Sequence, residues 1–130
     1  MNSAPPLDAL VEHLRHALPG LQGIWLFGSE AKGTSHADSD LDIAVLGPTP
    51  FDAVRIFDLG LQLGVLARRD VDLVDLRRLP IVLQKEVLVD GRLLAPIDSR
   101  ACAAFELDSI AMYVAFRDEL ALASTAGDRR

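Results

Sequence analysis

Two short apolar segments joined by a polar loop constrain the fold of this sequence more than any other feature. Residues 24–27 form a continuous apolar run that stops at Gly28, and residues 41–46 form a second run. Short apolar runs with a glycine or proline at their ends are typical of buried strands. The loop between them opens with Gly28-Ser29 and closes, after ten further residues, with Asp40-Leu41-Asp42. The sequence therefore predicts a strand, a glycine turn and an acidic second strand.

The other apolar patterns alternate between helical and extended periodicity. Leucines recur at helical spacing over residues 7–18, which predicts an amphipathic first helix. The further elements that we expect are a helix at 51–67, a strand at 71–76, a helix at 79–89, a short extended piece at 92–94, a helix from about 98 to 123 and a frayed tail at 124–130. Alternating strands and helices predict an α/β domain with a small sheet. We expect residues 1–130 to form a single domain, with its core at about 20–95.

The helix at 51–67 has two notable features. The apolar residues on one side of it are Phe51, Val54, Phe57 (or Ile56), Leu61 and Val65. Gly60 and Gly64 each weaken a helix by up to about 1 kcal/mol relative to alanine, and we interpret them as sites of close packing against the sheet. Arg68 and Arg69 follow, where we expect them to favour the dipole at the helix C-terminus.

Composition narrows the class of function. The 130 residues are 50% hydrophobic, which excludes an intrinsically disordered chain. The formal net charge of −6 makes the chain a poor candidate for binding a nucleic-acid backbone. The single cysteine excludes an internal disulfide and a cysteine-based zinc cluster. With no apolar run of the length that spans a membrane and no signal-peptide pattern, we expect a cytoplasmic protein.

The loop and the strand that follows it carry the chemistry. Gly28 allows a sharp turn and the close approach of a ligand, and Ser29 offers a hydroxyl and backbone N–H groups to an anion. Asp40 and Asp42 lie two apart on the expected strand, so their carboxylates share one face about 6.5–7 Å apart. Two carboxylates so placed repel each other unless a cation neutralises them, and magnesium, which prefers oxygen ligands, is the natural one.

Asp72 supplies a third carboxylate, in the middle of the apolar strand expected at 71–76. An unpaired charge there would be costly, so we expect it to meet a cation or to lie at the active edge of the sheet. Asp70 shares its face by strand parity and is the alternative third acid, whereas Asp75 lies on the other face. Three acids beside a phosphate loop predict metal-assisted phosphoryl or nucleotidyl transfer.

This pattern, Gly-Ser, ten residues, Asp-x-Asp and a later aspartate in a strand, resembles the nucleotidyltransferases similar to DNA polymerase β. In particular the chain resembles the minimal nucleotidyltransferase antitoxins that are encoded beside a HEPN-domain RNase toxin. The resemblance covers about residues 20–95. It implies a polymerase β-like palm fold, in which a small mixed β-sheet has flanking helices and a long C-terminal helix.

The resemblance also implies roles for individual residues. Asp40 and Asp42 would hold Mg²⁺ under the triphosphate of ATP, and Asp72 would complete the metal site and help to deprotonate the attacking hydroxyl. Gly28 and Ser29 would hold the β- and γ-phosphates, with Lys32 as the nearest basic candidate. AMP transfer to a tyrosine of the toxin would silence the RNase. Glu30 departs from the basic or neutral residue common in relatives, and an acid there is unhelpful unless it points away.

Other functions compete with this one. The final helix is apolar on more than one side, with Phe105, Met112, Tyr113, Phe116 and Leu120 in one stripe, which favours a protein-binding surface. An antitoxin that neutralises its toxin by binding alone, in a hetero-oligomer, would also need that surface. A small-molecule nucleotidyltransferase of the aminoglycoside type ranks lower, because such enzymes usually add a second domain.

Overall fold

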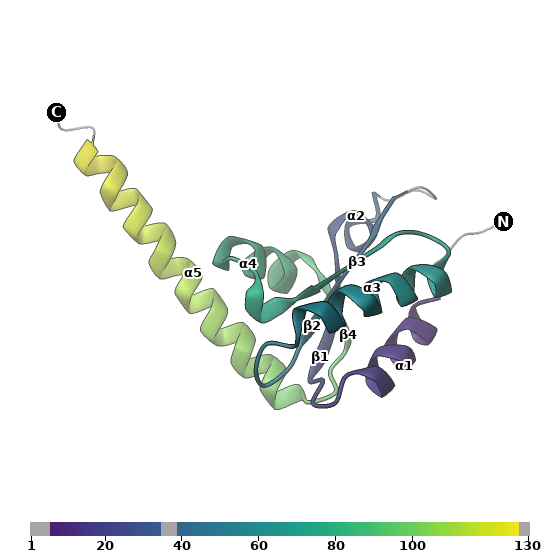
Figure 1. Cartoon of the computed structure of the whole chain (residues 1–130). Coiled ribbons are helices and arrows are strands. Elements are labelled where there is room, and N and C mark those ends of the chain that lie inside the picture. Colours follow the sequence, from purple (N-terminus) through teal and green to yellow (C-terminus); the bar gives the residue numbers. More distant parts are fainter. Residues whose placement is uncertain (1–5, 35–38, 128–130) are drawn as a thin grey trace.

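A mixed sheet of four strands lies at the centre of the structure, a computed structural model that describes residues 6–34 and 39–127 (Figure 1). The strands are β1 (Gly23–Phe27), β2 (Leu41–Leu46), β3 (Val71–Asp75) and β4 (Arg92–Ala95). Their order across the sheet is β3-β2-β1-β4. β1 is antiparallel to β2 and β4, and β2 is parallel to β3. The predicted small mixed sheet is confirmed.

The two central strands are buried on both faces, which explains their continuous apolar runs. Leu41, Ile43 and Val45 are fully buried on one face of β2, as the strand periodicity predicted. Ala44 and Leu46 are fully buried on the other face, in a second cluster around Trp25. A strand covered by helices on both sides lacks the alternation of apolar and polar residues that marks a half-exposed strand.

Two helices, α1 (Leu7–Ala17) and α3 (Ala53–Ala67), cover one face of the sheet (Figure 1). The Asp52 side chain caps α3 by accepting a hydrogen bond of 3.1 Å from the Arg55 amide. The side of α3 that packs against the core differs from the apolar side that the sequence predicted. That buried face is made of Ile56, Leu59, Gly60, Leu63 and Ala67.

The apolar side predicted for α3 is largely exposed instead. Val54, Phe57, Leu61 and Val65 have 58–80% of their surface in solvent. The helix has two apolar sides, and leucines such as Leu59 and Leu63 fill the space beside the sheet. Gly60 faces β3, as predicted, but a Cβ there would lie 3.5 Å from the Leu73 Cβ, which is an ordinary van der Waals contact. The packing against β3 therefore does not by itself require a glycine at this position.

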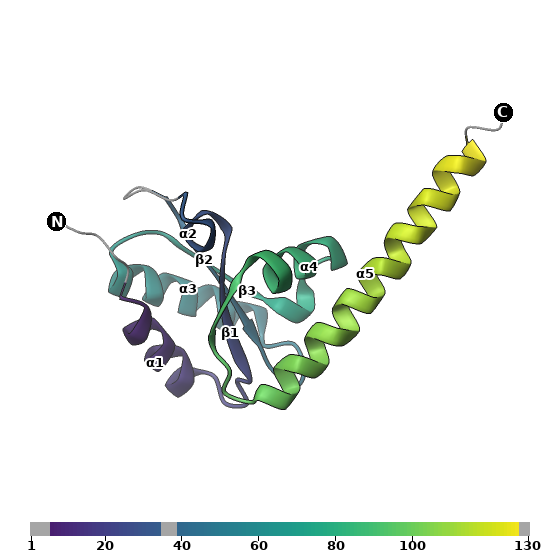
Figure 2. The ribbon, with the colours of Figure 1, turned by 180° about the vertical axis from the view of Figure 1, so that it is seen from behind.

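The opposite face of the sheet is covered by α4 (Ile81–Asp90) and the first turns of α5 (Ser99–Gly127) (Figure 2). The strand predicted to reach residue 76 ends at Asp75, and the helix predicted from residue 79 begins at Ile81. Between them, Leu76–Arg78 form a short 3₁₀ turn. Its cap is the Asp75 carboxylate, which accepts a hydrogen bond of 3.0 Å from the Arg77 amide.

The helix α5 runs past α4 and projects from the body of the molecule (Figures 1 and 2). It extends to Gly127, so the frayed tail predicted from residue 124 is wrong for residues 124–127, and residues 128–130 lie outside the described chain. Every side chain from Val114 to Ser124 is exposed. None of the helices described is both long and apolar enough to cross a membrane.

Candidate active site

The turn after β1 places a glycine directly against an acidic side chain. The short helix α2 (Gly28–Lys32) begins immediately after Phe27, as expected for a turn of this kind. Gly28 has a φ of +72°, a backbone conformation that side chains disfavour, and a Cβ there would overlap the Asp42 carboxylate. Glycine is therefore required at this position both by the backbone and by the space that Asp42 occupies.

Asp42 and Asp72 are neighbours across the parallel pair β2–β3. They are Cα partners in the strand register, so their side chains leave the same face of the sheet. This face is the one that α4 covers, because Ala44 and Leu46 of the same strand pack in that cluster. Asp42 is half-buried and Asp72 is exposed. The third carboxylate predicted from the sequence thus lies beside the second, at the edge strand.

Burial, the largest cause, together with the negative charges of Asp72, Asp40 and Glu86, raises the pKa of the Asp42 carboxyl from 3.8 to about 6. Three acids from separate parts of the chain therefore act on one carboxylate. Glu86 lies on α4 and was missed by the sequence reasoning. No local sequence pattern marks it, because its effect on Asp42 depends on the contact of α4 with the sheet.

Asp40 lies one residue before β2 rather than within it, and its side chain is exposed. The prediction that Asp40 and Asp42 share a strand is therefore wrong by one residue. The strand pairing begins at Leu41, whose amide donates a hydrogen bond of 2.9 Å to the Asp70 carbonyl. Asp40 is nevertheless close enough to Asp42 for its charge to raise the pKa of that carboxyl.

The carboxylates of the site suit a magnesium ion whose remaining coordination positions are filled by water and substrate phosphates. Within residues 6–34 and 39–127, no three Asp, Glu, His or Cys side chains are already gathered as a metal cage. Magnesium does not require one, because it is usually held by one or two carboxylates together with water and substrate phosphates. The adjacent Asp42 and Asp72 offer such carboxylates, and a nearby cation would offset the repulsion that raises the pKa of Asp42.

Two other acids near β3 have different surroundings. Asp75 is 3% exposed and accepts hydrogen bonds from the amides of Phe51, at 2.6 Å, and Arg77, at 3.0 Å. These contacts make it a structural residue on the opposite face from Asp72. Asp70 precedes β3, and its carbonyl oxygen accepts the bond from Leu41.

The basic residues of this region also differ in their surroundings. Lys32, the basic candidate for phosphate contact, is exposed at the end of α2. Arg69 follows the C-terminus of α3, as predicted, but its side chain also has specific partners outside that helix. Its guanidinium donates to the Ser39 carbonyl and lies 3.3 Å from the Glu30 carboxylate. Glu30 is thus paired with a cation, whose positive charge offsets the negative charge of this acid beside the phosphate loop.

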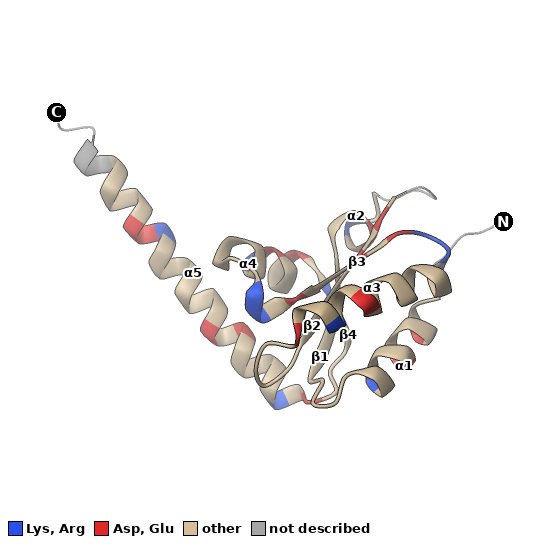
Figure 3. Cartoon of the chain, in the orientation of Figure 1, with Lys and Arg blue, Asp and Glu red and all other residues tan. Residues whose placement is uncertain are grey.

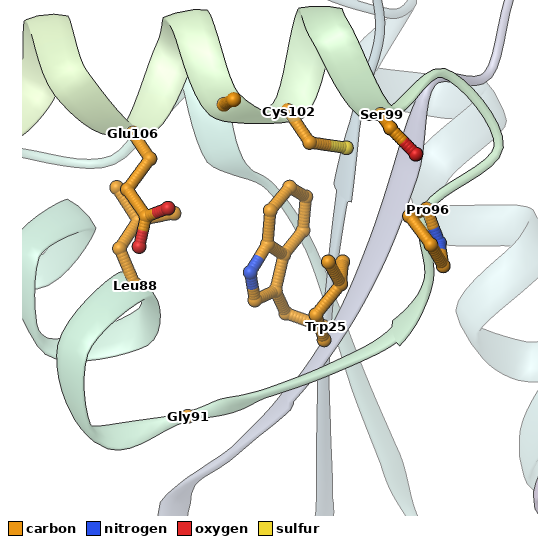
Figure 4. Close-up of a pocket in the computed structure, with 9 residues that line it drawn as sticks. Trp25, Leu88, Gly91, Pro96, Ser99, Cys102 and Glu106 are labelled. Carbon is orange, nitrogen blue, oxygen red and sulfur yellow. The ribbon is translucent and has the colours of Figure 1, made fainter.

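A separate pocket of about 360 Å³ lies between β1, α4, β4 and α5 (Figure 4). The Trp25 indole and the Cys102 thiol face each other in it, with Glu106 to one side. The thiol donates to the Gln22 carbonyl at 3.2 Å, and burial raises its pKa, so it stays protonated at neutral pH. The pocket therefore presents an apolar wall rather than a nucleophile.

Comparison with known proteins points to one family. Residues 10–100 match the family described as "Polymerase beta, Nucleotidyltransferase". The chain is 42% identical over 85 residues to the protein adenylyltransferase MntA of Shewanella oneidensis, and this match covers 65% of the chain. The matched segment spans 61% of the length of that curated relative.

Solved structures show the same likeness over most of the chain. A toxin-antitoxin crystal structure with AMP-PNP contains a chain that is 34% identical, with a TM-score of 0.84 and coverage of 93% of this chain and 98% of that one. The tri-AMPylated HEPN toxin of Shewanella oneidensis in complex with MNT antitoxin contains a chain that is 32% identical, with a TM-score of 0.76 and coverage of 92% and 93%.

Proposed function

This chain belongs to the polymerase beta nucleotidyltransferase family, and we propose that it transfers AMP from ATP to a tyrosine hydroxyl of a HEPN-domain RNase toxin, which silences the toxin. The observation that carries the proposal is Gly28, whose missing Cβ leaves room for Asp42 beside Asp72. The relatives agree in chemistry, since one is named a protein adenylyltransferase and another is seen with a tri-AMPylated toxin.

The nucleotide would lie against the turn after β1. Gly28 and Ser29 would hold the β- and γ-phosphates, through backbone N–H groups and the Ser29 hydroxyl. Lys32 would reach the phosphates from the end of α2, since its side chain is exposed. A bound AMP-PNP, an ATP analogue, in one of the similar complexes supports ATP as the donor.

Asp40, Asp42 and Asp72 would hold the metal, and we propose Mg²⁺ because all three offer oxygen ligands. When bound, the ion supplies positive charge to the phosphate oxygens on which negative charge develops during transfer. Asp40 would reach it from the end of the loop, and Asp42 and Asp72 from neighbouring strands. Asp72, as the exposed acid, would also accept a proton from the acceptor.

The reaction is a displacement at the α-phosphorus of ATP. The tyrosine oxygen forms a new bond to this phosphorus, and the bond from phosphorus to the bridging oxygen breaks. Pyrophosphate leaves with the electron pair, and the tyrosine proton goes to Asp72. No oxidant or further reactant is required, so ATP and the toxin tyrosine account for every atom transferred.

The projecting part of α5 would bind the toxin in a hetero-oligomer. Leu107 and Met112 are exposed where α5 runs beside α4, and Phe116, Leu120 and Leu122 are exposed beyond it. Figure 3 shows the charged residues of α5 confined to a few short segments. A lone helix that exposes this much apolar surface gains free energy by burying it against a partner. A cytoplasmic location belongs to the same proposal, because ATP and Mg²⁺ are plentiful there.

The test is intact mass spectrometry of the neighbouring gene's product after incubation with this protein, ATP and Mg²⁺. We expect mass gains in steps of one AMP, lost when Mg²⁺ is removed with EDTA and lost in Asp40→Asn and Asp42→Asn. Asp72→Asn should lower the rate of transfer more than Asp70→Asn, and the reverse order would assign Asp70 as the third acid.

The same mixtures separate catalysis from binding. A stable complex that blocks RNase activity with no mass gain would make the chain an antitoxin that acts by binding, for which the exposed α5 would suffice. Transfer of AMP to an aminoglycoside, with none to the protein, would favour a small-molecule enzyme. Either result would overturn the proposed protein acceptor.

A further inference from the structure

We infer that Arg69 is a positioning residue for nucleotidyl transfer: one guanidinium joins the two ends of the loop that carries the site. The inference rests on the proposed function and adds a residue to it. Arg69 lies in the turn between α3 and β3, and its side chain is 10% exposed. It contacts Glu30 in α2, at the start of the loop, and Ser39 at its end.

The contact with Ser39 is made by two donors of the guanidinium. Arg69 Nε and Nη2 donate to the Ser39 carbonyl oxygen at 3.0 and 2.8 Å. Two donors on one planar group fix the direction of the carbonyl as well as its distance, which the single ammonium of a lysine does not. The backbone immediately before Asp40 is therefore held by a side chain from another part of the fold.

The backbone immediately after Asp40 is held by the adjacent residue of the same turn. The Leu41 amide donates to the Asp70 carbonyl at 2.9 Å. Asp40 thus lies between two anchored residues, although it belongs to no strand and its side chain is exposed. The dipeptide Arg69-Asp70 sets the position from which the Asp40 carboxylate reaches the site.

The backbone of the turn between α3 and β3 places Arg69 beside the loop that joins α2 to β2. Arg68 caps α3 in the left-handed conformation, with a φ of +56°, which is uncommon for a residue other than glycine. This conformation reverses the chain so that β3 can start beside β2. Gly64 lets the turn pack closely, since a Cβ there would lie 3.3 Å from the Arg69 carbonyl oxygen.

The contact with Glu30 serves the charge of the site. Glu30 follows Ser29, where a triphosphate would bring several negative charges. Arg69 Nη2 lies 3.3 Å from the Glu30 carboxylate, whose side chain is only 21% exposed. A half-buried pair is screened less by solvent than a surface pair, so the loss of Arg69 would remove a positive charge that offsets Glu30 beside the nucleotide.

These two contacts predict two separable effects. Arg69→Ala should weaken the binding of AMP-PNP with Mg²⁺ about tenfold, because it removes the positive charge that offsets Glu30. It should also lower kcat about tenfold or more, because the Ser39 carbonyl loses both guanidinium donors. Adding Glu30→Gln to Arg69→Ala should restore AMP-PNP affinity to within about threefold of wild type while kcat stays low. Arg69→Lys keeps a positive charge near Glu30 and should give the same pattern as the double variant.

The measurements are calorimetric titration with AMP-PNP and Mg²⁺, steady-state rates of AMP transfer, and thermal unfolding of each variant. Arg55→Ala is the matched control, because Arg55 also donates to a backbone carbonyl, that of Ala17 at 2.8 Å, but lies on α3 away from the acids. We expect this control to retain AMP-PNP affinity and kcat, so a loss confined to Arg69 is not a general effect of removing an arginine.

The results separate failure of this inference from failure of the proposed function. If wild type transfers AMP and Arg69→Ala matches it in affinity and kcat, Arg69 has no positioning role. If affinity and kcat fall together in every Arg69 variant and Glu30→Gln rescues neither, the residue is merely structural. If wild type binds AMP-PNP but transfers no AMP, the proposed function fails, and the affinities alone still test whether Arg69 offsets Glu30. Should Arg69→Ala not fold, the Lys variant and its kcat decide the outcome.

Discussion

Replacing Asp42 by asparagine should make the metal-free protein more stable while abolishing its activity. The pKa of Asp42 rises from 3.8 to about 6 on folding, chiefly because burial disfavours its charged form. The folded chain therefore binds a proton more tightly than the unfolded chain. This contribution to stability is present at low pH and is lost as the pH rises from about 4 to above 6. Asparagine carries no charge at any pH and avoids the loss.

The size of the effect follows from the shift. Two pKa units correspond to at most about 3 kcal/mol, and solvent screening of a half-buried carboxylate reduces the expected gain to about 1 kcal/mol. The gain should appear in EDTA at pH 7.5 and be mostly absent at pH 4. The assay is urea unfolding followed by the fluorescence of Trp25, the single tryptophan, which is 4% exposed.

Magnesium supplies the complementary measurement. Added Mg²⁺ should raise the urea midpoint of wild type at pH 7.5, because it binds the folded state, and should leave Asp42→Asn unchanged. An Asp42→Asn protein that is less stable than wild type at pH 7.5 in EDTA, or equally stabilised at both pH values, would refute the reasoning that repulsion and burial raise the free energy of this carboxylate.

Three further predictions address the turn, the cap of α3 and the exposed helix. Gly28→Ala should cost about 1–3 kcal/mol and abolish transfer, because its Cβ would displace Asp42 at a positive φ; denaturant unfolding and the AMP mass assay check both effects, and full activity would contradict the geometry. Arg68→Gly should stabilise the fold by about 0.5–1 kcal/mol, since glycine accepts a φ of +56° without strain, and a lower unfolding midpoint would count against it. Phe116→Glu should weaken a toxin complex at least tenfold in a pull-down titration while the unfolding midpoint stays the same; an unfolded variant would mean that Phe116 belongs to the core.

The sequence predicted the elements that depend on local chemistry. The strands β1 and β2 could be read from their apolar runs, and the turn at Gly28 from a glycine that follows a buried strand. The alternation of Leu41, Ile43 and Val45 gave the core face of β2 correctly. That Asp42 and Asp72 lie close together could also be predicted, because each acid occupies an apolar strand. The parallel pairing of these two strands makes the acids neighbours.

The errors occurred where contacts between distant residues decide the structure. Periodicity found apolar residues on α3 but could not choose between its two apolar sides, since that choice depends on the shape of the space beside β3. Arg69 was assigned to the helix dipole because it follows the end of the helix expected at 51–67, yet its hydrogen-bond partner lies 30 residues away along the chain. Glu86 acts on Asp42 only because α4 crosses the sheet there, which no local pattern records.

The projection of α5 has a consequence for how a partner is bound. From Val114 to Ser124 the helix is exposed on every side, and segments of about this length are marginally helical without tertiary support. We therefore expect this part of α5 to fray in the free protein, with backbone amides that exchange with deuterium faster than those of α3. A partner that binds this segment must shift its helix–coil equilibrium towards helix. Part of the free energy of binding is therefore offset by the cost of ordering the segment. In the complex the same amides should exchange more slowly, and the positions of the slowed amides would identify the helical turns that contact the partner.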